Sequence, residues 1–314
     1  MAEKKATRTA YGEALLKLGE ENPKVVVLDA DLSQSTRTNG FGKKYPHRFF
    51  NMGIAEANLM GAAAGMASLG LVPFASTFAI FATGRAYEQI RNTIAYADLN
   101  VKIAATHAGL TVGEDGGSHQ ALEDIGLMRG LPHPRMVVAV PADAAEAEQI
   151  VQEAANFVGP VYIRLGRADV PFIPRSTEYS FTWGAAQLLR QGEDITICAT
   201  GYMVHIAWEA VDMLAAAGIS AELLNIPFIK PLDKDTILSS IKHTQRVVTV
   251  EEHSIDNGLG SALAELIAEK APCPLERMGV RGVFGESGKP EELLARHGLT
   301  AANIAETCRR MVAR

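Results

Sequence analysis

The sequence contains few cysteines, and their spacing does not suit cross-linking. Only three occur, Cys198, Cys273 and Cys308, which is an odd number with no CxxC pair. Disulfide frameworks and structural zinc sites use even sets or closely spaced pairs of cysteine. We therefore expect a reducing compartment, and the cytoplasm fits best.

Long apolar runs and an excess of positive charge are also missing. The apolar stretches are broken by Gly, Asn or charged residues before the roughly 20 residues that span a bilayer, and the charged N-terminus is unlike a secretory signal peptide. The formal net charge is −6, with 30 Lys and Arg against 36 Asp and Glu. Because binding to a phosphate backbone needs a basic field, nucleic acid is disfavoured as the main partner. The sequence thus predicts neither a membrane nor a nucleic-acid partner.

Short β-branched runs alternate with helical patterns along the whole chain. In the first half, helical spacing at 8–20, 55–68 and 81–96 is interleaved with strand-like runs such as "VVVLD", "LVPFAST" and "VKIAAT". Strands that alternate with helices of this length indicate βαβ units and parallel sheets. Ligands of such sheets bind beyond the carboxyl ends of the strands.

A stretch rich in prolines and aromatics interrupts this alternation and separates a second, smaller unit. A chain of 314 residues is long enough for two domains, each with a core of its own. We expect an α/β fold of two doubly wound domains, over residues 1–175 and 192–314, joined by a linker at 176–191.

Glu56 stands at the start of a run of almost only small and apolar residues, "FFNMGIAEANLMGAAAGMASLG" at 49–70. Gly61 and Gly65 are four residues apart, so one helix face lacks bulk and allows close approach of a helix or a cofactor. The helix dipole favours an acid at the N-terminal end. Taken alone, such a Glu is more often a cap on a buried helix than a catalytic acid.

A second cluster, "THAGLTVGEDGGSHQALED" at 106–124, brackets four glycines and an acid pair between His107 and His119. A Gly-rich loop between a strand and a helix allows close approach of a ligand, and His with Asp can move protons near neutral pH. The spacing matches neither HxxxH nor a zinc finger, so no metal site is predicted. The alternative interpretation is a surface turn with solvated charges.

Together these stretches resemble the transketolase family of thiamine-diphosphate enzymes. With "PFASTFAIFATGRAYEQIRN" and "GPVYIRLGR", they occur in the family's order and at its spacing, and the resemblance covers the whole chain. It implies a pyrimidine-binding domain at 1–175 and a transketolase C-terminal domain at 192–314. The family's diphosphate-binding domain has a GDG motif that holds Mg²⁺ or Ca²⁺, and no GDG occurs here.

The resemblance therefore implies the C-terminal subunit of a split, two-chain transketolase. Thiamine diphosphate would bind between this chain and an N-terminal subunit carrying the GDG motif, which would hold most of the metal's ligands. Two copies of each subunit would form an α2β2 heterotetramer. The implied reaction, which belongs to the pentose phosphate pathway, moves a two-carbon ketol unit from a ketose phosphate to an aldose phosphate.

The resemblance also assigns cofactor contacts. Glu56 matches the carboxylate that bonds N1′ of the aminopyrimidine and so helps to remove the proton at C2 of the cofactor. Phe78 and Phe81 match the aromatic wall around the pyrimidine, and Asp31 matches an acid near the cofactor. The family commonly has a Tyr three residues after the second Phe, where this chain has Gly84.

Further matched positions imply a substrate site. The sugar phosphate would be held by two guanidinium groups, a hydroxyl and an imidazole, namely Arg8, Ser35, His107 and Arg167. Asp115 and His119 match residues that contact the sugar hydroxyls, and His119 would also move protons during carbon–carbon cleavage. Arg164 is a weaker candidate, because its side chain alternates with that of the matched site.

Other relatives of the same architecture are alternatives. Deoxyxylulose-phosphate synthase shares the "GIAE" motif but usually lacks a His at the position of His107. The beta subunit of a 2-oxo acid dehydrogenase matches in length, yet its loop differs from "GEDGGSHQ". A specialised transketolase for an unusual sugar phosphate is also open. A non-enzymatic scaffold is disfavoured because Glu56, His107 and Asp115 are all present.

Overall fold

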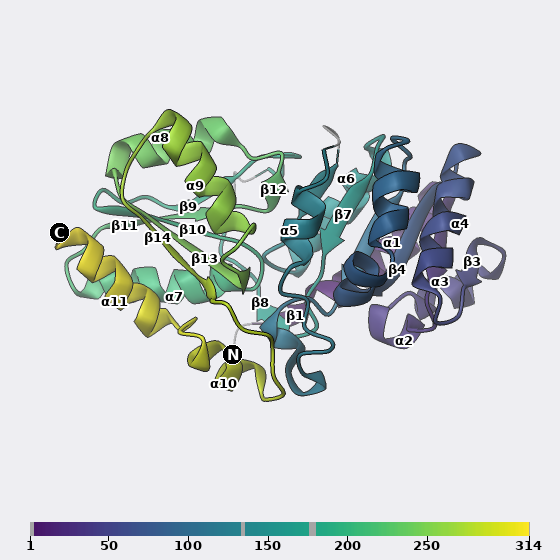
Figure 1. Ribbon diagram of the computed structural model, residues 1–314, viewed down its shortest axis with the longest axis horizontal. Helices are drawn as coiled ribbons and strands as arrows, with labels where there is room; N and C mark the ends of the chain where they lie inside the picture. Colours follow the sequence, from purple (N-terminus) through teal and green to yellow (C-terminus); the bar gives the residue numbers. More distant parts are fainter. Residues whose placement is uncertain (1–2, 133–135, 176–179, 314) are drawn as a thin grey trace.

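The computed structural model describes residues 3–132, 136–175 and 180–313, which form two α/β units side by side (Figure 1). The first unit is built on a seven-stranded sheet of order β12-β6-β7-β5-β4-β2-β3. Neighbouring strands are parallel except at the edge, where β12 runs antiparallel to β6. The strands are β2 (Val25–Asp29), β3 (Phe49–Asn51), β4 (Val72–Phe78), β5 (Lys102–Thr106), β6 (Val137–Ala139), β7 (Val161–Arg164) and β12 (Phe228–Lys230).

Helices cover both faces of this sheet. On one face, α1 (Thr7–Glu21) and α6 (Ala144–Asn156) pack against alternate strand residues such as Val25 and Val27. On the other, α4 (Glu56–Ser68) packs against Val26 and Leu28, and α5 (Asp124–Arg129) packs beside β6 and β12. A parallel sheet that is buried on both faces needs near-continuous apolar strands, which is why β2 reads "VVVLD".

The region that the sequence predicts as one helix at 81–96 forms two π-helical segments instead, Phe81–Arg85 and Gln89–Ala95. π-Helical turns occur mostly as short insertions, frequently at functional sites. The first segment directly follows β4 and carries Phe81 and Arg85, whose side chains reach the site described below.

The second unit has a five-stranded sheet of order β14-β13-β10-β11-β9, parallel except for the edge strand β9. Its helices α7 and α11 pack on one face and α8 and α9 on the other. These elements are β9 (Gln187–Arg190), β10 (Ile195–Ala199), α7 (Met203–Ala216), β11 (Ala221–Asn225), α8 (Lys234–Thr244), β13 (Val247–Ser254), α9 (Leu259–Lys270), β14 (Leu275–Val280) and α11 (Ala301–Val312). Two doubly wound α/β units, the predicted fold class, are thus confirmed.

The two units are joined by more than a linker. β12 follows the second unit's strand β11 in the chain, yet it extends the sheet of the first unit. One apolar core runs continuously from Val26 of β2 to Leu263 of α9. Part of the expected linker forms β9, and its residues 176–179 lie outside the described residues. No helix in the described ranges is both long and apolar enough to cross a bilayer.

Shorter elements complete the chain. They are β1 (Lys4–Ala6), which pairs with β8 (Asp169–Pro171), the helices α2 (Ser33–Thr36), α3 (Asn39–Lys44) and α10 (Pro290–Arg296), and 3₁₀ turns at Pro46–Arg48 and Leu110–Asp115.

Candidate active site

The sheet of the first unit brings residues from distant parts of the chain to one edge. Asp31 follows the carboxyl end of β2, Phe78 ends β4, His107 follows β5 and Arg167 follows β7. These strands are parallel neighbours, so their carboxyl ends lie together, which is where ligands of open α/β sheets bind.

Glu56 is the first residue of α4, and only 5% of it is exposed. Its Oε1 accepts a hydrogen bond from Arg85 Nη1 at 3.0 Å. The Arg85 guanidinium also lies 4.1 Å from the centroid of the Phe81 ring, in a cation–π contact. Since the Arg85 side chain is 53% exposed, a half-exposed cation joins the buried carboxylate to an aromatic ring. Arg85 is not among the residues that the motifs predict.

Four rings form one aromatic cluster, which we define as Phe78, Phe81, His107 and His119. Phe78 and Phe81 are stacked, with centroids 5.7 Å apart and planes 16° apart. His107 stacks on Phe78 at 3.8 Å, and the His119 ring meets Phe81 edge-on at 5.3 Å. The Phe78–Phe81 stack and the edge-on contact of His119 are arrangements that aromatic rings favour. The structure thus places both predicted phenylalanines and both predicted histidines together.

The imidazole of His107 is neutral. Its Nε2 lies 3.3 Å from Arg8 Nη1, and since a guanidinium only donates, Nε2 must accept. The proton is therefore on Nδ1, which lies 2.9 Å from Thr106 Oγ1 and donates to it. Burial, followed by the charges of Arg8 and Arg167, lowers the pKa of His107 to about 3.

Three arginines, Arg8, Arg37 and Arg167, form a group beside the aromatic cluster. Burial, followed by the charges of Arg37 and Arg167, lowers the pKa of Arg8 to about 10. Arg8 Nη1 also donates to the backbone carbonyl of Ser35 at 2.9 Å, so Ser35 contacts it through the main chain. Guanidinium groups held near one another favour an anion between them. The motifs do not single out Arg37, although it lies two residues after Ser35 in "SQSTRTN".

Arg167, one of these three arginines, also contacts the Gly-rich loop. Its Nη1 donates to the carbonyl of Val112 and lies 3.7 Å from a carboxylate oxygen of Asp115 and 3.6 Å from one of Glu114. Asp115 is therefore held beside the predicted substrate arginine, on the same loop that presents His119.

A buried aspartate that the motifs do not single out shapes the loop after β2. One carboxylate oxygen of Asp29 accepts from the hydroxyls of Thr36 (2.6 Å) and Thr38 (3.0 Å), and the other from the backbone N–H of Leu32. Burial raises the pKa of Asp29. These bonds fix the turn on which Ser35 and Arg37 lie.

Two candidates lie apart from the aromatic cluster. Asp31 is exposed, has a left-handed backbone (φ +64°) and accepts from Asn51 Nδ2 at 2.9 Å. Arg164 is buried at the junction of the two units, where its Nε donates to Asp124 at 2.8 Å and its Nη2 to the carbonyl of Glu252 at 3.1 Å. Arg164 thus serves the junction between the units.

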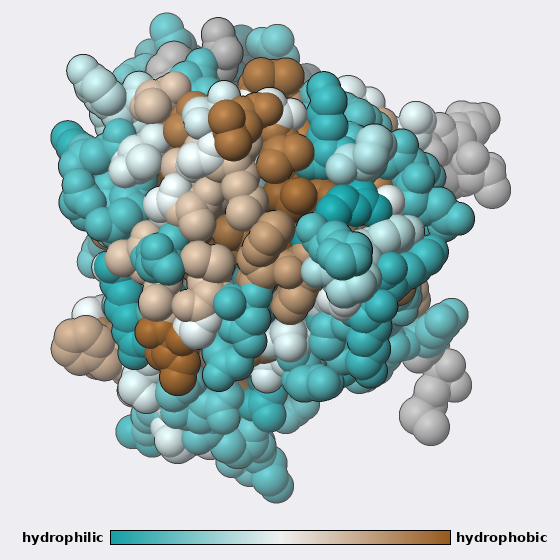
Figure 2. Space-filling model, turned by 90° about the vertical axis from the view of Figure 1, so that its right-hand side faces the viewer, coloured by the Kyte–Doolittle hydropathy of each residue, from teal (hydrophilic) through white to brown (hydrophobic). Residues whose placement is uncertain are grey.

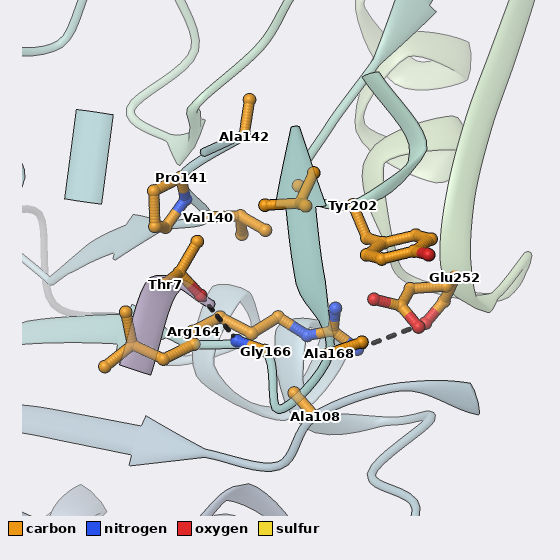
Figure 3. Close-up of a pocket in the computed structure, with 13 residues that line it drawn as sticks. Thr7, Ala108, Val140, Pro141, Ala142, Arg164, Gly166, Ala168, Tyr202 and Glu252 are labelled. Atoms are coloured by element: carbon orange, nitrogen blue, oxygen red, sulfur yellow. Dashed lines mark hydrogen bonds between the residues drawn. The ribbon is translucent and has the colours of Figure 1, made fainter. Parts of the chain in front are cut away.

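A small cavity of about 20 Å³ lies at this junction, between Thr7, Arg164, Tyr202 and Glu252 (Figure 3). Thr7 Oγ1 accepts from the backbone N–H of Gly166 at 2.8 Å beside it. Such a volume holds about one water molecule. The cavity cannot take a sugar phosphate, so the candidate site is the open edge formed by the aromatic cluster, Glu56 and the arginines.

Comparisons with known proteins identify both domains of the chain. The pyrimidine-binding domain of transketolase matches residues 3–172, and the transketolase C-terminal domain matches residues 184–304. A putative transketolase C-terminal section from Methanocaldococcus jannaschii is 49% identical over 304 residues, covering 96% of this chain and 95% of its own length.

Two further relatives are similar over nearly their whole length. A 6-deoxy-6-sulfo-D-fructose transketolase subunit from Clostridium sp. is 41% identical, covering 98% of this chain and 94% of the relative. A solved structure described as a split gene transketolase, an inactive beta4 tetramer, is 53% identical with a TM-score of 0.90, covering 98% of both chains. The chain therefore belongs to the transketolase family and carries its pyrimidine-binding and C-terminal domains.

Proposed function

We propose that this chain is the C-terminal subunit of a split transketolase, which transfers a two-carbon ketol unit from a ketose phosphate to an aldose phosphate. One observation carries the proposal: a buried carboxylate, Glu56, lies beside the stacked Phe78 and Phe81, with neutral His107 and three arginines beyond them. This is a site for a flat heteroaromatic ring next to a site for an anion.

The residues present fit the aminopyrimidine of thiamine diphosphate, on which the family depends. The stacked phenylalanines offer a face to a flat ring, and the carboxylate of Glu56 needs a polar partner because it is buried. Glu56 would hold N1′ of the pyrimidine through a charge-assisted hydrogen bond. N1′ would then replace the half-exposed Arg85 as the partner of this carboxylate. When bound, the cofactor supplies a carbon nucleophile at C2 of its thiazolium ring.

The arginine group supports a doubly charged substrate end. Arg8, Arg37 and Arg167 would meet a phosphate dianion with a surplus of positive charge, and neutral His107 would add a hydrogen bond without further repulsion. His119, whose edge faces the stacked phenylalanines, and Asp115 would contact the sugar hydroxyls. In this role His119 would pass protons between substrate oxygens and solvent.

We assign the diphosphate and its Mg²⁺ or Ca²⁺ ion to an N-terminal partner subunit that carries the GDG motif. Two features support a partner: GDG does not occur in this sequence, and the split-gene relative is described as an inactive beta4 tetramer. The free thiols of Cys198, Cys273 and Cys308 suit the reducing cytoplasm in which we place the enzyme.

The face that carries α4 supports assembly. Figure 2 shows a band of apolar residues on the side of the molecule where α4 lies. Ile54, Leu69 and Tyr96 are 77%, 82% and 86% exposed, and a Cβ added at Gly61 or Gly65 would meet no atom within 4 Å. A smooth apolar face of this kind is typical of a subunit interface. An α2β2 heterotetramer would cover it.

A second candidate function uses a sulfonated sugar. The Clostridium relative is described as a subunit of a 6-deoxy-6-sulfo-D-fructose transketolase, and the arginine group would bind a sulfonate as well as a phosphate. The two functions therefore differ mainly in the anionic group of the donor sugar, which is a phosphate in the first and a sulfonate in the second.

A coupled ketol-transfer assay tests both functions. The chain is assayed alone and with its GDG-containing partner, with thiamine diphosphate, Mg²⁺ and ribose 5-phosphate as the acceptor. Activity with xylulose 5-phosphate in the mixture only is the expected result. Activity with 6-deoxy-6-sulfofructose alone would favour the second function, and a folded mixture that is inactive with both donors would refute both.

A further inference from the structure

The C-terminal unit holds one end of the loop that carries Asp115 and His119. We call residues 109–120 the histidine loop. Near its start, the carboxylate of Glu252 accepts hydrogen bonds from the backbone N–H of Thr111 at 3.0 Å and from the Thr111 hydroxyl at 3.2 Å. Glu252 is a buried residue of β13. A two-point bond from a buried carboxylate fixes both position and orientation.

A second segment of the C-terminal unit holds the other end. We call residues 284–290, which precede and begin α10, the C-terminal arm. Gln120 Nε2 donates to the carbonyl of Glu286 at 3.0 Å. A Cβ added at Gly117 would collide with the carbonyl of Gly285, and one added at Gly285 would collide with Gln120 Oε1. Arm and loop therefore interlock at glycines, where no side chain fits.

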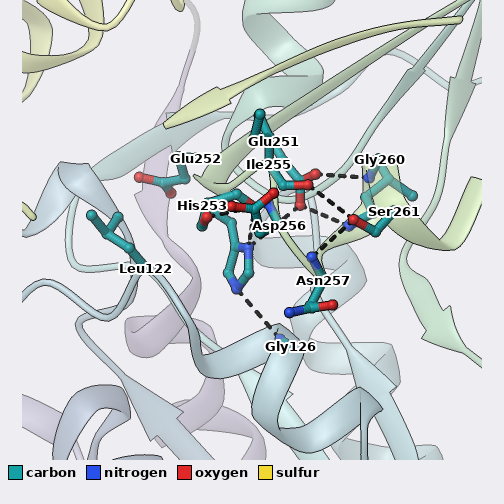
Figure 4. Close-up of polar contacts among 12 residues, drawn as sticks. Leu122, Gly126, Glu251, Glu252, His253, Ile255, Asp256, Asn257, Gly260 and Ser261 are labelled. Carbon is teal, nitrogen blue, oxygen red and sulfur yellow. Dashed lines mark hydrogen bonds and ion pairs between the residues drawn. The ribbon is translucent and has the colours of Figure 1, made fainter. Parts of the chain in front are cut away.

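The chain just beyond the histidine loop is held by the same strand, β13 (Figure 4). The carbonyl of Leu122 accepts from the backbone N–H of Ser254 at 2.8 Å, and His253 Nε2 accepts from the backbone N–H of Gly126 at 3.4 Å. Glu251 accepts from two N–H groups at the start of α9, which anchors that end of β13. The C-terminal unit thus holds the chain at points from the start of the histidine loop to the start of α5.

These contacts matter because the sequence of the histidine loop does little to fix its conformation. It contains Gly109, Gly113 and Gly116, all with positive φ, together with Gly117. A chain segment rich in glycine loses much conformational entropy when it is ordered. External contacts must supply the order that keeps the His119 ring edge-on to Phe81 at 5.3 Å.

We propose that the C-terminal unit is a positioning element for catalysis: Glu252 and the C-terminal arm set the placement of Asp115 and His119 over the aromatic cluster. The expected effect on the turnover of sugar phosphates rests on the proposed function, whereas the placement of His119 does not. Glu252 and the arm contact the histidine loop, so both act through it. The C-terminal unit thereby has a defined part in a site built on the other unit.

Two variants test the proposal, with a matched control. Gly285→Ala places a methyl group against Gln120 and displaces the end of the loop, and Thr111→Val removes one of the two bonds to Glu252 while keeping the shape. The control is Gly40→Ala in α3, where the added Cβ would have only ordinary contacts with Leu16. Thr111→Val, the milder change, supplies the test if Gly285→Ala does not fold.

The first readout is the NMR resonance of the His119 ring in histidine-labelled chain, assigned by its loss in His119→Gln. We expect this resonance to move in both test variants, because His119 leaves the ring-current field of Phe81, and to stay in Gly40→Ala. An unmoved resonance in the folded test variants overturns the proposal. This readout needs no activity, so it stands even if ketol transfer is never found.

The second readout is kinetic and uses the chain assembled with its partner. We expect kcat/KM for the sugar phosphates to fall on the order of 10- to 100-fold in the test variants, with the affinity for thiamine diphosphate unchanged because Glu56, Phe78 and Phe81 are untouched. A moved His119 resonance with unchanged kcat/KM overturns the proposal. A mixture inactive even without substitutions refutes the proposed function separately.

Discussion

Arg8 Nη1 lies 3.3 Å from Nε2 of His107, and because a guanidinium only donates, the buried imidazole accepts this bond as an uncharged ring. The His107 backbone has a φ of +57°, a conformation that residues other than glycine rarely adopt. The surroundings must therefore hold it there. The neutral ring and the constrained backbone support the proposed role of His107 in binding a substrate.

The neutral state of His107 makes a prediction for the pH dependence of stability. Its pKa is about 3 in the folded chain against an ordinary value of 6.5, so only the unfolded chain takes up this proton between those values. The contribution to stability is full above pH 6.5 and is lost as the pH falls toward 3. Between pH 7 and pH 4 we expect it to cost on the order of 3 kcal/mol.

Urea unfolding of the wild type and of His107→Gln at pH 7, 5.5 and 4 measures this effect. The free energy of unfolding of the wild type should fall more steeply with acid than that of the variant. Parallel pH profiles would show that His107 is not held neutral.

Arg37 should strengthen binding of the anionic end of the substrate. We expect Arg37→Gln to raise the KM for a sugar phosphate roughly five- to tenfold, since hydrogen bonds to charged groups contribute more than neutral ones. The affinity for thiamine diphosphate should not change. Lys43→Gln is the matched control, because it removes one positive charge from an exposed position in α3. Equal KM values for the two variants would remove Arg37 from the substrate site.

The open face of α4 should carry subunit contacts. Ala57, Gly61 and Gly65 follow one another at helical spacing on its outer side, and a Cβ at Gly65 would meet nothing within 4 Å. We therefore expect Gly65→Arg to fold and to gain up to about 1 kcal/mol of stability as a free chain, because glycine is a poor helix former.

The same variant should assemble poorly, since a charged side chain would project from the apolar face. Analytical ultracentrifugation of the chain alone and with its partner, with Gly65→Ala as the milder comparison, measures the effect. Unchanged assembly of Gly65→Arg would place the interface elsewhere.

Much of the fold follows from local sequence. The runs "VVVLD" and "VKIAAT" are fully buried strands because every position is apolar or is held by neighbours, and helices with apolar periodicity lie between them. The resemblance to transketolases is what pointed to the two phenylalanines and the two histidines of the aromatic cluster. Each lies at or just after the carboxyl end of a strand or on the Gly-rich loop, and parallel strands bring those ends together.

What the sequence did not predict depends on contacts between remote residues. β12 is a three-residue strand whose partner β6 lies about 90 positions earlier, so nothing local marks it. Arg85 reaches Glu56 because the chain after β4 forms a π-helical turn where apolar periodicity predicts an ordinary helix. The bond between Gln120 and Glu286 spans 166 positions. Such contacts are set by the packing of the two units against each other.

Exchange of the C2 proton of thiamine diphosphate with solvent deuterium tests the central claim most directly, because it reports on Glu56 before any sugar is chosen. The chain is mixed with its GDG-containing partner, Mg²⁺ and cofactor, and exchange is followed by NMR after acid quenching. We expect fast exchange in the mixture, slow exchange with either chain alone, and a loss on the order of 100-fold or more in Glu56→Gln, comparable with losing a key proton-transfer group. Exchange in Glu56→Gln at the wild-type rate, with the cofactor bound, would contradict the account.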